Sequence, residues 1–484
     1  MRLPTLLSLP LLSLATLVVE AFPKSYQNDA ISRSVELGGS VTTVTSTITA
    51  RSIADQPGDY VLPLAGKTGK VPIAWEVSVN RNKLGQIATS IDPETGAQVV
   101  YIPANLTQKD QLASIILTEY LAYQSKPLPE IIGQDEAQYL QFSSETTFPE
   151  TAYHTKKMTI KYRAPRKIVS HSKTPNSYLP SESTSKPYKL AGSSLNLGPF
   201  HNVPASIKTV GFKQSPLTIH YDTSEPVLAI KTLQRFAEVG MWGGNLNMED
   251  KITLFNAGPK LRGFFSRLDF QSARFRPTFP AQILREITYP IPEGASSPYY
   301  YDSIGNISTS HFRPSSRAGL PAILEIQPRF PLLGGWSFEF TVGWDLNLGS
   351  WMKTVGGDKK MLAVPFMTGL KGVVVDEAEL IVTLPEGAKN VEVVAPFPVA
   401  AVEHSVHKTY LDSTGRPRIT IKKALASESN EQNIYITYTY PFYASLQKPA
   451  VVTLASLTFF AIYWIVKRLD MRIASASVVK TKTE

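Results

Sequence analysis

The most regular pattern along the chain is the alternation of apolar and polar residues that is typical of a half-buried β-strand. It is clearest at residues 433–440 (NIYITYTY), and it recurs at 158–162 (MTIKY). Residues 40–49 (SVTTVTSTIT) are rich in β-branched side chains, which pack well on a pleated surface. These segments predict that the protein is mainly β.

Further candidate strands are spaced about 15 to 40 residues apart, with Gly, Pro and Asn between them. They begin near Ile73, Ala97, Leu324, Phe338, Val373 and Arg418. This spacing favours antiparallel, β-sandwich-like domains over βαβ units. The 36 prolines in 484 residues favour the same class, because proline interrupts helices and central strands. Some helix is expected too, but residues 112–123 are ambiguous, since their helical spacing spans too short a window to decide.

The first 21 residues (MRLPTLLSLPLLSLATLVVEA) have the features of a secretory signal peptide. Arg2 precedes a leucine-rich core, and the small residue Ala21 stands before Phe22, where we expect cleavage. An N-terminal amphipathic or membrane-spanning segment is the alternative. It fits less well because Pro4 and Pro10 interrupt a short apolar run.

A second apolar segment, residues 449–466 (PAVVTLASLTFFAIYWIV), has 18 residues without a charge. As a helix it would be about 27 Å long, which suits the thinner hydrocarbon core of the endoplasmic reticulum membrane. A buried core helix is the alternative, but such a helix is seldom apolar all round, and Tyr463 and Trp464 suit a membrane interface. We therefore predict one transmembrane helix.

Charge sets the expected orientation of that helix. Residues 467–484 carry five Lys or Arg against two acidic residues, whereas only Lys448 flanks the other end closely. The positive-inside rule then places 467–484 in the cytosol and 22–448 in the lumen, a single-pass type I topology.

The lumenal part is long enough for two domains with cores of their own. Residues 164–204 are rich in Ser, Pro and Lys, and we interpret them as a linker or a long irregular edge. We place the boundary near residue 210, giving β-rich domains at 22–210 and 211–448. No short-period repeat is evident.

Composition excludes several classes of function. The net charge of +9 is spread along the chain, which does not indicate nucleic-acid binding. The sequence has no cysteine, so thiol catalysis, thiolate metal sites and disulfides are absent.

The sequence also lacks the motifs of common catalytic sites: no phosphate-binding loop, GxSxG elbow, HExxH helix or EF-hand occurs. His404 and His407 are close in sequence, but the valines beside them suggest a strand, where they would point to opposite faces. Neighbouring carboxylates such as Glu249 and Asp250, or the group Asp376, Glu377 and Glu379, are interpreted as exposed charges. We therefore predict no catalytic residue, no cofactor and no metal.

Two N-x-[ST] sequons, Asn105 (NLT) and Asn306 (NIS), are candidate glycosylation sites in a lumenal chain.

The aromatic-rich runs 299–313 (YYYDSIGNISTSHFR) and 324–344 (LEIQPRFPLLGGWSFEFTVGW) would suit either an aromatic β-core or a contact surface. They also closely resemble the ribophorin I family, a subunit of the oligosaccharyltransferase complex. The resemblance continues through MWGGNLNMED at Met241, GFFSRLDF at Gly263, TLPEGAKNVEV at Thr383 and YLDSTGRPRITIKK at Tyr410. It is looser in the N-terminal half, where 123–142 and 197–204 carry it.

The resemblance implies a type I protein of the endoplasmic reticulum membrane that is not itself the catalyst. In that family a separate multispanning subunit, using a divalent metal, transfers a preassembled glycan from dolichyl diphosphate to the Asn of N-x-S/T sequons. The implied role is to scaffold the complex and present acceptor chains, with the other subunits, the translocon and nascent polypeptides as partners. The alternative is an independent membrane-anchored lumenal hydrolase or peptidase.

Overall fold

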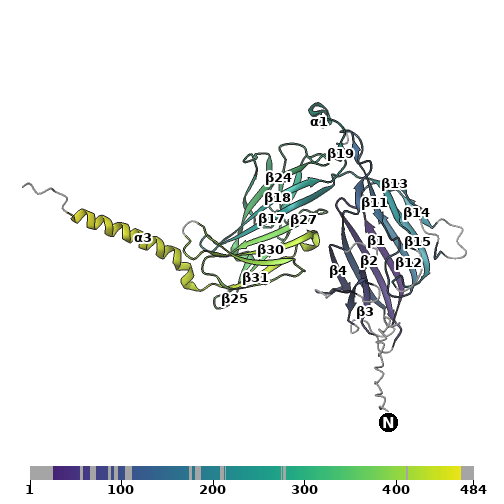
Figure 1. The fold of residues 1–484 in the computed structure, drawn as a ribbon, viewed down its shortest axis with the longest axis horizontal. Coiled ribbons are helices and arrows are strands. Elements are labelled where there is room, and N and C mark those ends of the chain that lie inside the picture. The colour runs from purple at the N-terminus through teal and green to yellow at the C-terminus, as the bar shows by residue number, and fades with distance from the viewer. Residues whose placement is uncertain are drawn as a thin grey trace, which may run out of the picture. The chain divides into compact units, whose positions relative to one another are not determined.

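The computed structural model describes residues 25–54, 58–65, 72–85, 89–91, 96–103, 112–173, 177–179, 187–207, 212, 214–273, 275, 279–409 and 412–469. The predicted signal peptide, Asn105 and most of the predicted cytosolic tail lie outside these residues. The described chain is mostly strand, and a long apolar helix lies near its C-terminus (Figure 1). The predicted fold class is confirmed.

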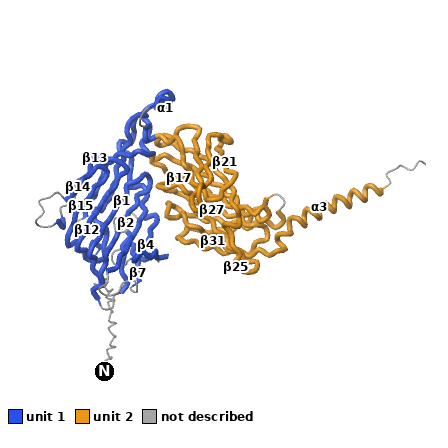
Figure 2. Tube along the Cα trace, turned by 180° about the vertical axis from the view of Figure 1, so that it is seen from behind, with its two compact units in different colours: residues 1–225, 258–282 blue, residues 226–257, 283–484 orange. Residues whose placement is uncertain are grey.

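The chain forms two compact units (Figure 2). Unit 1 comprises Met1–Glu225 and Gly258–Gln282, and unit 2 comprises Pro226–Ala257 and Ile283–Glu484. The chain therefore enters unit 2, returns once to unit 1, and leaves it again. A single boundary near residue 210 does not describe this exchange.

Unit 1 is built on an eight-stranded sheet with the order β14-β15-β12-β1-β2-β8-β4-β5. Its strands are β1 (Tyr26–Glu36), β2 (Val41–Ser52), β4 (Ala74–Val79), β5 (Asn82–Lys83), β8 (Leu112–Ala122), β12 (Thr155–Arg163), β14 (Tyr188–Ala191) and β15 (Ser194–Val203). Two smaller sheets have the orders β13-β16-β11-β9 and β3-β7-β6. Their strands are β3 (Tyr60–Ala65), β6 (Thr89–Ile91), β7 (Gln98–Ile102), β9 (Ser125–Pro127), β11 (Tyr139–Ser144), β13 (Ile168–His171) and β16 (Leu217–Asp222). The returning segment supplies β19 (Lys260–Leu261), which pairs with β10 (Ile131–Ile132), and helix α1 (Arg267–Ala273).

Unit 2 has a seven-stranded main sheet with the order β21-β24-β18-β17-β27-β30-β29. Its strands are β17 (Leu228–Gly240), β18 (Asn245–Asn256), β21 (Ser296–Asp302), β24 (Ser337–Asn347), β27 (Val374–Thr383), β29 (Ala401–His407) and β30 (Arg416–Ala426). The smaller sheets have the orders β25-β26-β31-β28 and β20-β23-β22. Their strands are β20 (Ile287–Ile291), β22 (Ser310–Arg313), β23 (Ala322–Ile326), β25 (Met352–Gly356), β26 (Lys359–Pro365), β28 (Lys389–Val394) and β31 (Asn433–Thr439). The helical elements are α2 (Leu348–Trp351), the 3-10 turn η2 (Glu428–Asn430) and α3 (Phe442–Arg468).

The two units repeat one topology. The order β8-β2-β1-β12-β15-β14 in unit 1 corresponds strand for strand to β24-β18-β17-β27-β30-β29 in unit 2. Both smaller sheets correspond in the same way, β9-β11-β16-β13 to β25-β26-β31-β28 and β3-β7-β6 to β20-β23-β22. In each main sheet the parallel contact falls at the same place, between β1 and β12 and between β17 and β27. The fold is a tandem repeat that the sequence does not reveal.

Two segments differ from the sequence-based expectations. Residues 112–122 form strand β8, in which Ala113, Ile115 and Leu117 are buried at a period of two. The apparent helical spacing arose because apolar residues also occupy the other face. Residues 164–204 are not a linker, because β13, β14 and β15 within them are sheet strands of unit 1, the first two at sheet edges.

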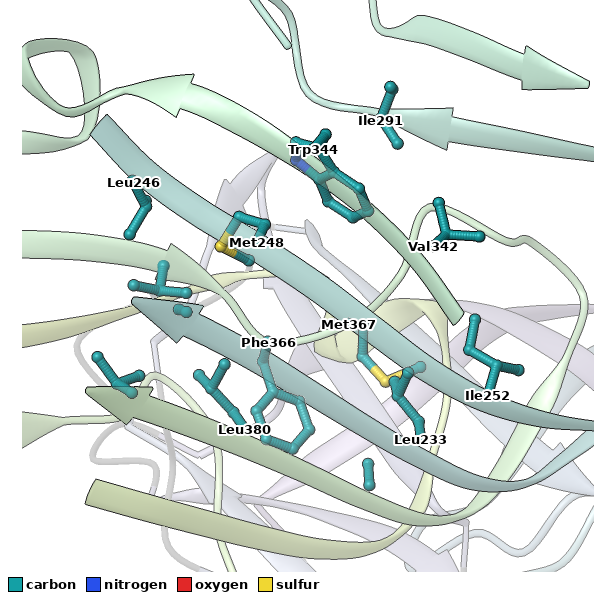
Figure 3. Close-up of a cluster of buried hydrophobic side chains, with 14 of the residues drawn as sticks. Leu233, Leu246, Met248, Ile252, Ile291, Val342, Trp344, Phe366, Met367 and Leu380 are labelled. Carbon is teal, nitrogen blue, oxygen red and sulfur yellow. The ribbon is translucent and has the colours of Figure 1, made fainter. Parts of the chain in front are cut away.

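A buried ion pair lies within the core of unit 2. Figure 3 shows that core, with Leu233 from β17, Met248 from β18 and Trp344 from β24. On the same two strands Arg235 and Asp250 are 3% and 0% exposed, and the guanidinium donates two hydrogen bonds of 2.7 and 2.6 Å to the carboxylate. The expectation that Asp250 is an exposed charge is therefore wrong.

This pair connects three sheets. The Arg235 Nη1 group donates to the carbonyls of Pro365, at 3.0 Å, and Met367, at the end of β26 and just beyond it. The Tyr289 hydroxyl, on β20, donates to Asp250 Oδ2. A buried arginine is tolerated here because one countercharge and two carbonyls surround it.

Replacing Asp250 with Asn should lower the free energy of unfolding of unit 2 by about 3 kcal/mol, because Arg235 would remain buried without its countercharge. This loss is measured by chemical denaturation, with hydrogen exchange of the β17 and β18 amides as the readout. The control is Glu339→Gln, which removes an exposed ion pair with Lys251 and should change the free energy by less than about 0.5 kcal/mol. Equal effects of the two substitutions would contradict the assignment.

Candidate functional site at the base of the membrane helix

Helix α3 contains the predicted span 449–466 and is longer than expected. It has 27 residues and is long and apolar enough to cross a membrane. Ala444 is buried, whereas the large apolar side chains of the helix are exposed, as expected for a helix in lipid. At its C-terminal end the Arg468 guanidinium lies 3.7 Å from the centre of the Trp464 ring.

The topology of unit 2 brings three connections to the base of this helix. Because β17 and β27 run parallel, the residues that follow them, 241–244 and 384–388, lie at the same end of the strands. Strand β30 is antiparallel to β27, so residues 412–415, which precede it, lie at that end as well. Side chains from all three connections contact the first turns of α3.

The closest approach is between Ala444 and Gly387. A Cβ atom added to Gly387 would lie 2.7 Å from the Ala444 Cβ, and the glycine has a φ of +89°. Both the space and the backbone conformation therefore require glycine. Ala444 is 6% exposed, so this small pair lets the helix pack directly on the unit.

We call the contacts between these three connections and the first turns of α3 the junction. Glu386 lies at the centre of its polar part. Its Oε1 atom accepts hydrogen bonds from the backbone N–H and the hydroxyl of both Ser413 and Thr414, at 2.6 to 2.9 Å. The Gln447 side chain of α3 donates to the Ser413 hydroxyl at 2.5 Å and lies 3.4 Å from the same carboxylate oxygen. Burial raises the pKa of Glu386, but the hydrogen bonds from Thr414 and Ser413 outweigh it, so the pKa lies below its ordinary value.

Asp412 binds the helix through charge. Its side chain is fully buried, and it forms ion pairs with Lys448 of α3 at 2.9 Å and with Arg416 at 3.2 Å. Arg416 also pairs with Glu238. Burial raises the pKa of Asp412, whereas the hydrogen bonds from Thr409 and Lys448 lower it, and the net result is well below the ordinary value. The carboxylate is therefore ionised at neutral pH.

Trp242 compensates for a proline in the helix. Pro449 has no N–H, so it cannot donate the usual helical hydrogen bond to the Ser445 carbonyl four residues earlier. The indole N–H of Trp242 donates to that carbonyl at 3.2 Å. The hairpin of β17 and β18 thus supplies the donor that the helix lacks.

These residues surround a cavity of about 370 Å³, whose lining includes Glu238, Trp242, Glu386, Arg416 and Lys448. In this lining Glu238 pairs with Arg416, Lys448 pairs with Asp412, and Glu386 accepts its hydrogen bonds through Oε1. Both acids of the junction, Glu386 and Asp412, have lowered pKa values. Carboxyls with a lowered pKa are ionised near neutral pH, so they have no proton to donate and are weak bases. The arrangement is suited to fixing a helix to a domain.

The residues singled out in the sequence lie elsewhere. Asn306 is exposed in the loop between β21 and β22, and Asn105 is outside the described residues. His404 and His407 lie on β29, as expected, in strand positions of opposite faces. Within the part of the chain that the structure describes, no group of three His, Cys, Asp or Glu residues could hold a metal ion.

Sequence reasoning missed the junction, although a signal was present. The runs beginning at Met241, Thr383 and Tyr410 carry the family resemblance, and they contain Trp242, Glu386 and Asp412 respectively. Distant segments that share a family pattern and each hold one polar residue are a reason to expect one site.

The sequence model of the Ribophorin I family matches residues 26–467, which include both units and most of α3. The chain belongs to the ribophorin I family. Curated relatives are named dolichyl-diphosphooligosaccharide–protein glycosyltransferase subunit 1 or its variants 1A and 1B. The Caenorhabditis elegans protein is 28% identical, with 92% of this chain and 72% of the relative covered. The Arabidopsis thaliana subunit 1A is 30% identical, with 78% and 57% covered, and subunit 1B is 29% identical, with 72% and 71% covered.

Solved structures give a much weaker likeness. Yeast leukotriene A4 hydrolase matches 44% of this chain and 31% of its own at 9% identity, with a TM-score of 0.26. An M1 zinc metallopeptidase from Deinococcus radiodurans matches 43% of this chain and 42% of its own at 9% identity, with a TM-score of 0.25. Likeness this slight carries no argument for a hydrolase or peptidase. The ribophorin I family match, by contrast, includes every residue of the junction.

A double-mutant cycle tests the role of Trp242. Trp242→Phe should lower the free energy of local opening of residues 444–448 by about 1 kcal/mol, because the Ser445 carbonyl loses its donor. Hydrogen exchange of the full chain in lipid nanodiscs measures this change. In a Pro449→Ala background the helix supplies its own N–H, so the same substitution should cost about half as much or less. Equal costs in both backgrounds would show that the indole bond does not compensate for Pro449.

Proposed function

We propose that this chain is a noncatalytic subunit of an oligosaccharyltransferase complex and that it acts as a scaffold. The family match from residue 26 to 467 carries this proposal, together with relatives named as subunit 1 of that glycosyltransferase. The complex transfers a preassembled glycan from dolichyl diphosphate to Asn in N-x-S/T sequons. We assign catalysis to a separate multispanning subunit.

The junction supports a structural role. Glu386 and Asp412 use their carboxylates on hydrogen bonds and ion pairs within the chain, and Lys448 of α3 is one partner. A domain fixed to its transmembrane helix in this way holds a constant position above the membrane. That is useful for presenting nascent acceptor chains to a catalytic subunit, and the translocon is a further expected partner.

We place the protein in the endoplasmic reticulum membrane as a single-pass type I protein. The signal peptide at residues 1–21 directs the two units to the lumen. The pair Lys467 and Arg468, with the basic residues after it, keeps the end of the chain in the cytosol.

Helix α3 has a face suited to docking on another transmembrane helix. Ala455 and Thr458 lie in a shallow groove of about 360 Å³, whose other lining residues are Val451, Leu454, Phe459 and Ile462. These positions are three or four residues apart, so they share one face. In lipid, small residues promote helix association because they let the backbones approach closely.

Ala455→Leu should fill this groove and reduce co-purification of the catalytic subunit at least several-fold in mild detergent. Thr453→Leu is the matched control, because it enlarges a small residue on the opposite face, and it should leave recovery unchanged. Normal recovery with Ala455→Leu, and with the whole span 449–466 replaced by an unrelated apolar segment, would show that α3 is only an anchor. Absence of the catalytic subunit from the wild-type preparation would contradict membership of the complex.

We also propose that Asn306 carries a glycan. Its side chain is exposed, and Arg329 donates a hydrogen bond to its backbone carbonyl. The next residue, Ile307, donates its backbone N–H to the Tyr300 carbonyl. No described residue hydrogen-bonds to its amide group. Asn105 is the second candidate.

Asn306→Gln should increase gel mobility by one glycan. Ser308→Ala should give the same shift, because it destroys the sequon and leaves the asparagine in place. Asn105→Gln tests the second site in the same assay. If neither Asn306→Gln nor Ser308→Ala changes mobility, or only one of them does, the site at Asn306 is refuted.

A further inference from the structure

The repeated topology reveals that Arg33 of unit 1 is the counterpart of Arg235. Strands β1 and β17 correspond, and each has a bulge in its pairing with the next strand, at Asp29 and at Lys231. Arg33 lies four residues after the first bulge and Arg235 four residues after the second. The two arginines therefore occupy the same place in the two copies of the fold.

Their surroundings differ. The residue paired with Arg235 on the next strand is Asp250, whereas the one paired with Arg33 is Ser46. The Nε atom of Arg33 is buried and has no hydrogen-bond partner. Both arginines line a cavity, of about 1120 Å³ beside Arg235 and about 300 Å³ beside Arg33, but only Arg235 has an aspartate as its partner.

This cavity contains acceptors without partners. Glu119 lines it, is 6% exposed, and receives no hydrogen bond from any described residue. The Oε2 atom of Glu150 and the hydroxyl of Thr151, which also line it, are buried and unpartnered. Burial raises the pKa of Glu119 to about 7, with Arg33 opposing the shift and Glu150 adding to it. A buried carboxyl that nothing satisfies is costly, so it indicates a missing partner.

Charge and shape identify the kind of partner. The lining holds three carboxyl groups, those of Glu119, Glu145 and Glu150, against the single guanidinium of Arg33, in a chain whose net charge is +9. The remaining wall is mixed. Its aliphatic part is formed by Ile31, Ile48, Leu62, Leu64, Leu117 and Leu121, and its polar part by Ser46, Gln124, Ser143, Ser144, Thr146, Thr151 and Thr218. Ser143 and Glu145 on the lining are exposed, so the cavity is open to solvent.

We propose that this cavity in unit 1 binds the side chain of a lysine from a polypeptide. The ammonium group has three N–H donors for the carboxyls of Glu119 and Glu150 and the hydroxyl of Thr151. Its positive charge offsets the excess of carboxylate, and its methylene stem packs on the aliphatic wall. The site does not depend on the proposed role in the transferase.

Binding should depend on pH in a defined direction. The charged groups around Glu119 are Arg33 on β1, Glu150 in the connection from β11 to β12, and Glu145 on the cavity lining. Tyr162 of β12 lies beside Arg33. The ammonium group requires an ionised Glu119, and the pKa of that carboxyl is about 7 in the free protein. Affinity should therefore be highest above neutral pH and fall as the pH decreases below it, with release of protons on binding near pH 7.

Calorimetric titration of the full chain in nanodiscs tests the proposal. The probe is a tripeptide with lysine between two glycines and both ends blocked, and its control has norleucine, which keeps the stem and lacks the ammonium group. We expect the lysine peptide to bind and the norleucine peptide not to bind. Glu119→Gln should weaken binding at least tenfold, whereas Glu36→Gln, at a side chain 62% exposed on β1, should not change it.

A measurement on the unaltered protein covers the case in which Glu119→Gln fails to fold. Affinity for the lysine peptide should fall roughly tenfold or more between pH 7.5 and 5.5, since each unit below the pKa removes about nine-tenths of the remaining carboxylate. Equal binding of both peptides, no binding at millimolar concentration, or binding that is independent of pH would overturn the proposal. Binding of methyl mannoside in place of the lysine peptide would also overturn it, because it would indicate a sugar site.

Discussion

The ion pair between Arg235 and Asp250 is the interaction on which the architecture of unit 2 depends. Removing two charges from water is costly, and the fold repays it with two direct hydrogen bonds, two backbone carbonyls and the Tyr289 hydroxyl. These partners come from three different sheets, so the pair fixes their mutual arrangement. Strands β17, β27 and β30 belong to the same main sheet as the pair, and α3 docks on the connections at one end of those strands.

The repeat shows how one topology has been used in two ways. Unit 2 keeps an aspartate opposite its central arginine, and the two form an ion pair beside a cavity of about 1120 Å³. Unit 1 keeps the arginine, places Ser46 opposite, and leaves a cavity with unpaired acceptors. The strand order is unaffected, because alternation of buried residues and backbone pairing determine it. One buried position, Ser46 on β2 or Asp250 on β18, thus determines whether the central arginine has a countercharge on the next strand.

Sequence patterns predicted what depends on local periodicity. The alternation at 433–440 identified β31, and the uniform apolar run at 449–466 identified the centre of α3. Asp250 was misjudged because burial of a charge depends on its partners, and Arg235 lies on another strand. The sequence did not predict the junction for the same reason, because Glu386, Ser413 and Gln447 are brought together only in the folded chain. The repeat was invisible because the two copies share strand order and burial, which many different side chains can satisfy.

The number of donors available to a buried carboxyl separates the two kinds of site in this chain. Glu386 and Asp412 have several donors, so their pKa values are lowered. Their contribution to stability is therefore complete at any pH above their ordinary pKa values, and it is lost only as the pH falls through the lowered pKa values. Glu119 receives no hydrogen bond from the described residues, and burial raises its pKa, so ionising it costs stability as the pH rises from the ordinary value of 4.5 toward 7. The anchor is therefore insensitive to pH near neutrality. The cavity of unit 1 is poised to respond to it, because an incoming cation gains most where the protein has left a charge unsatisfied.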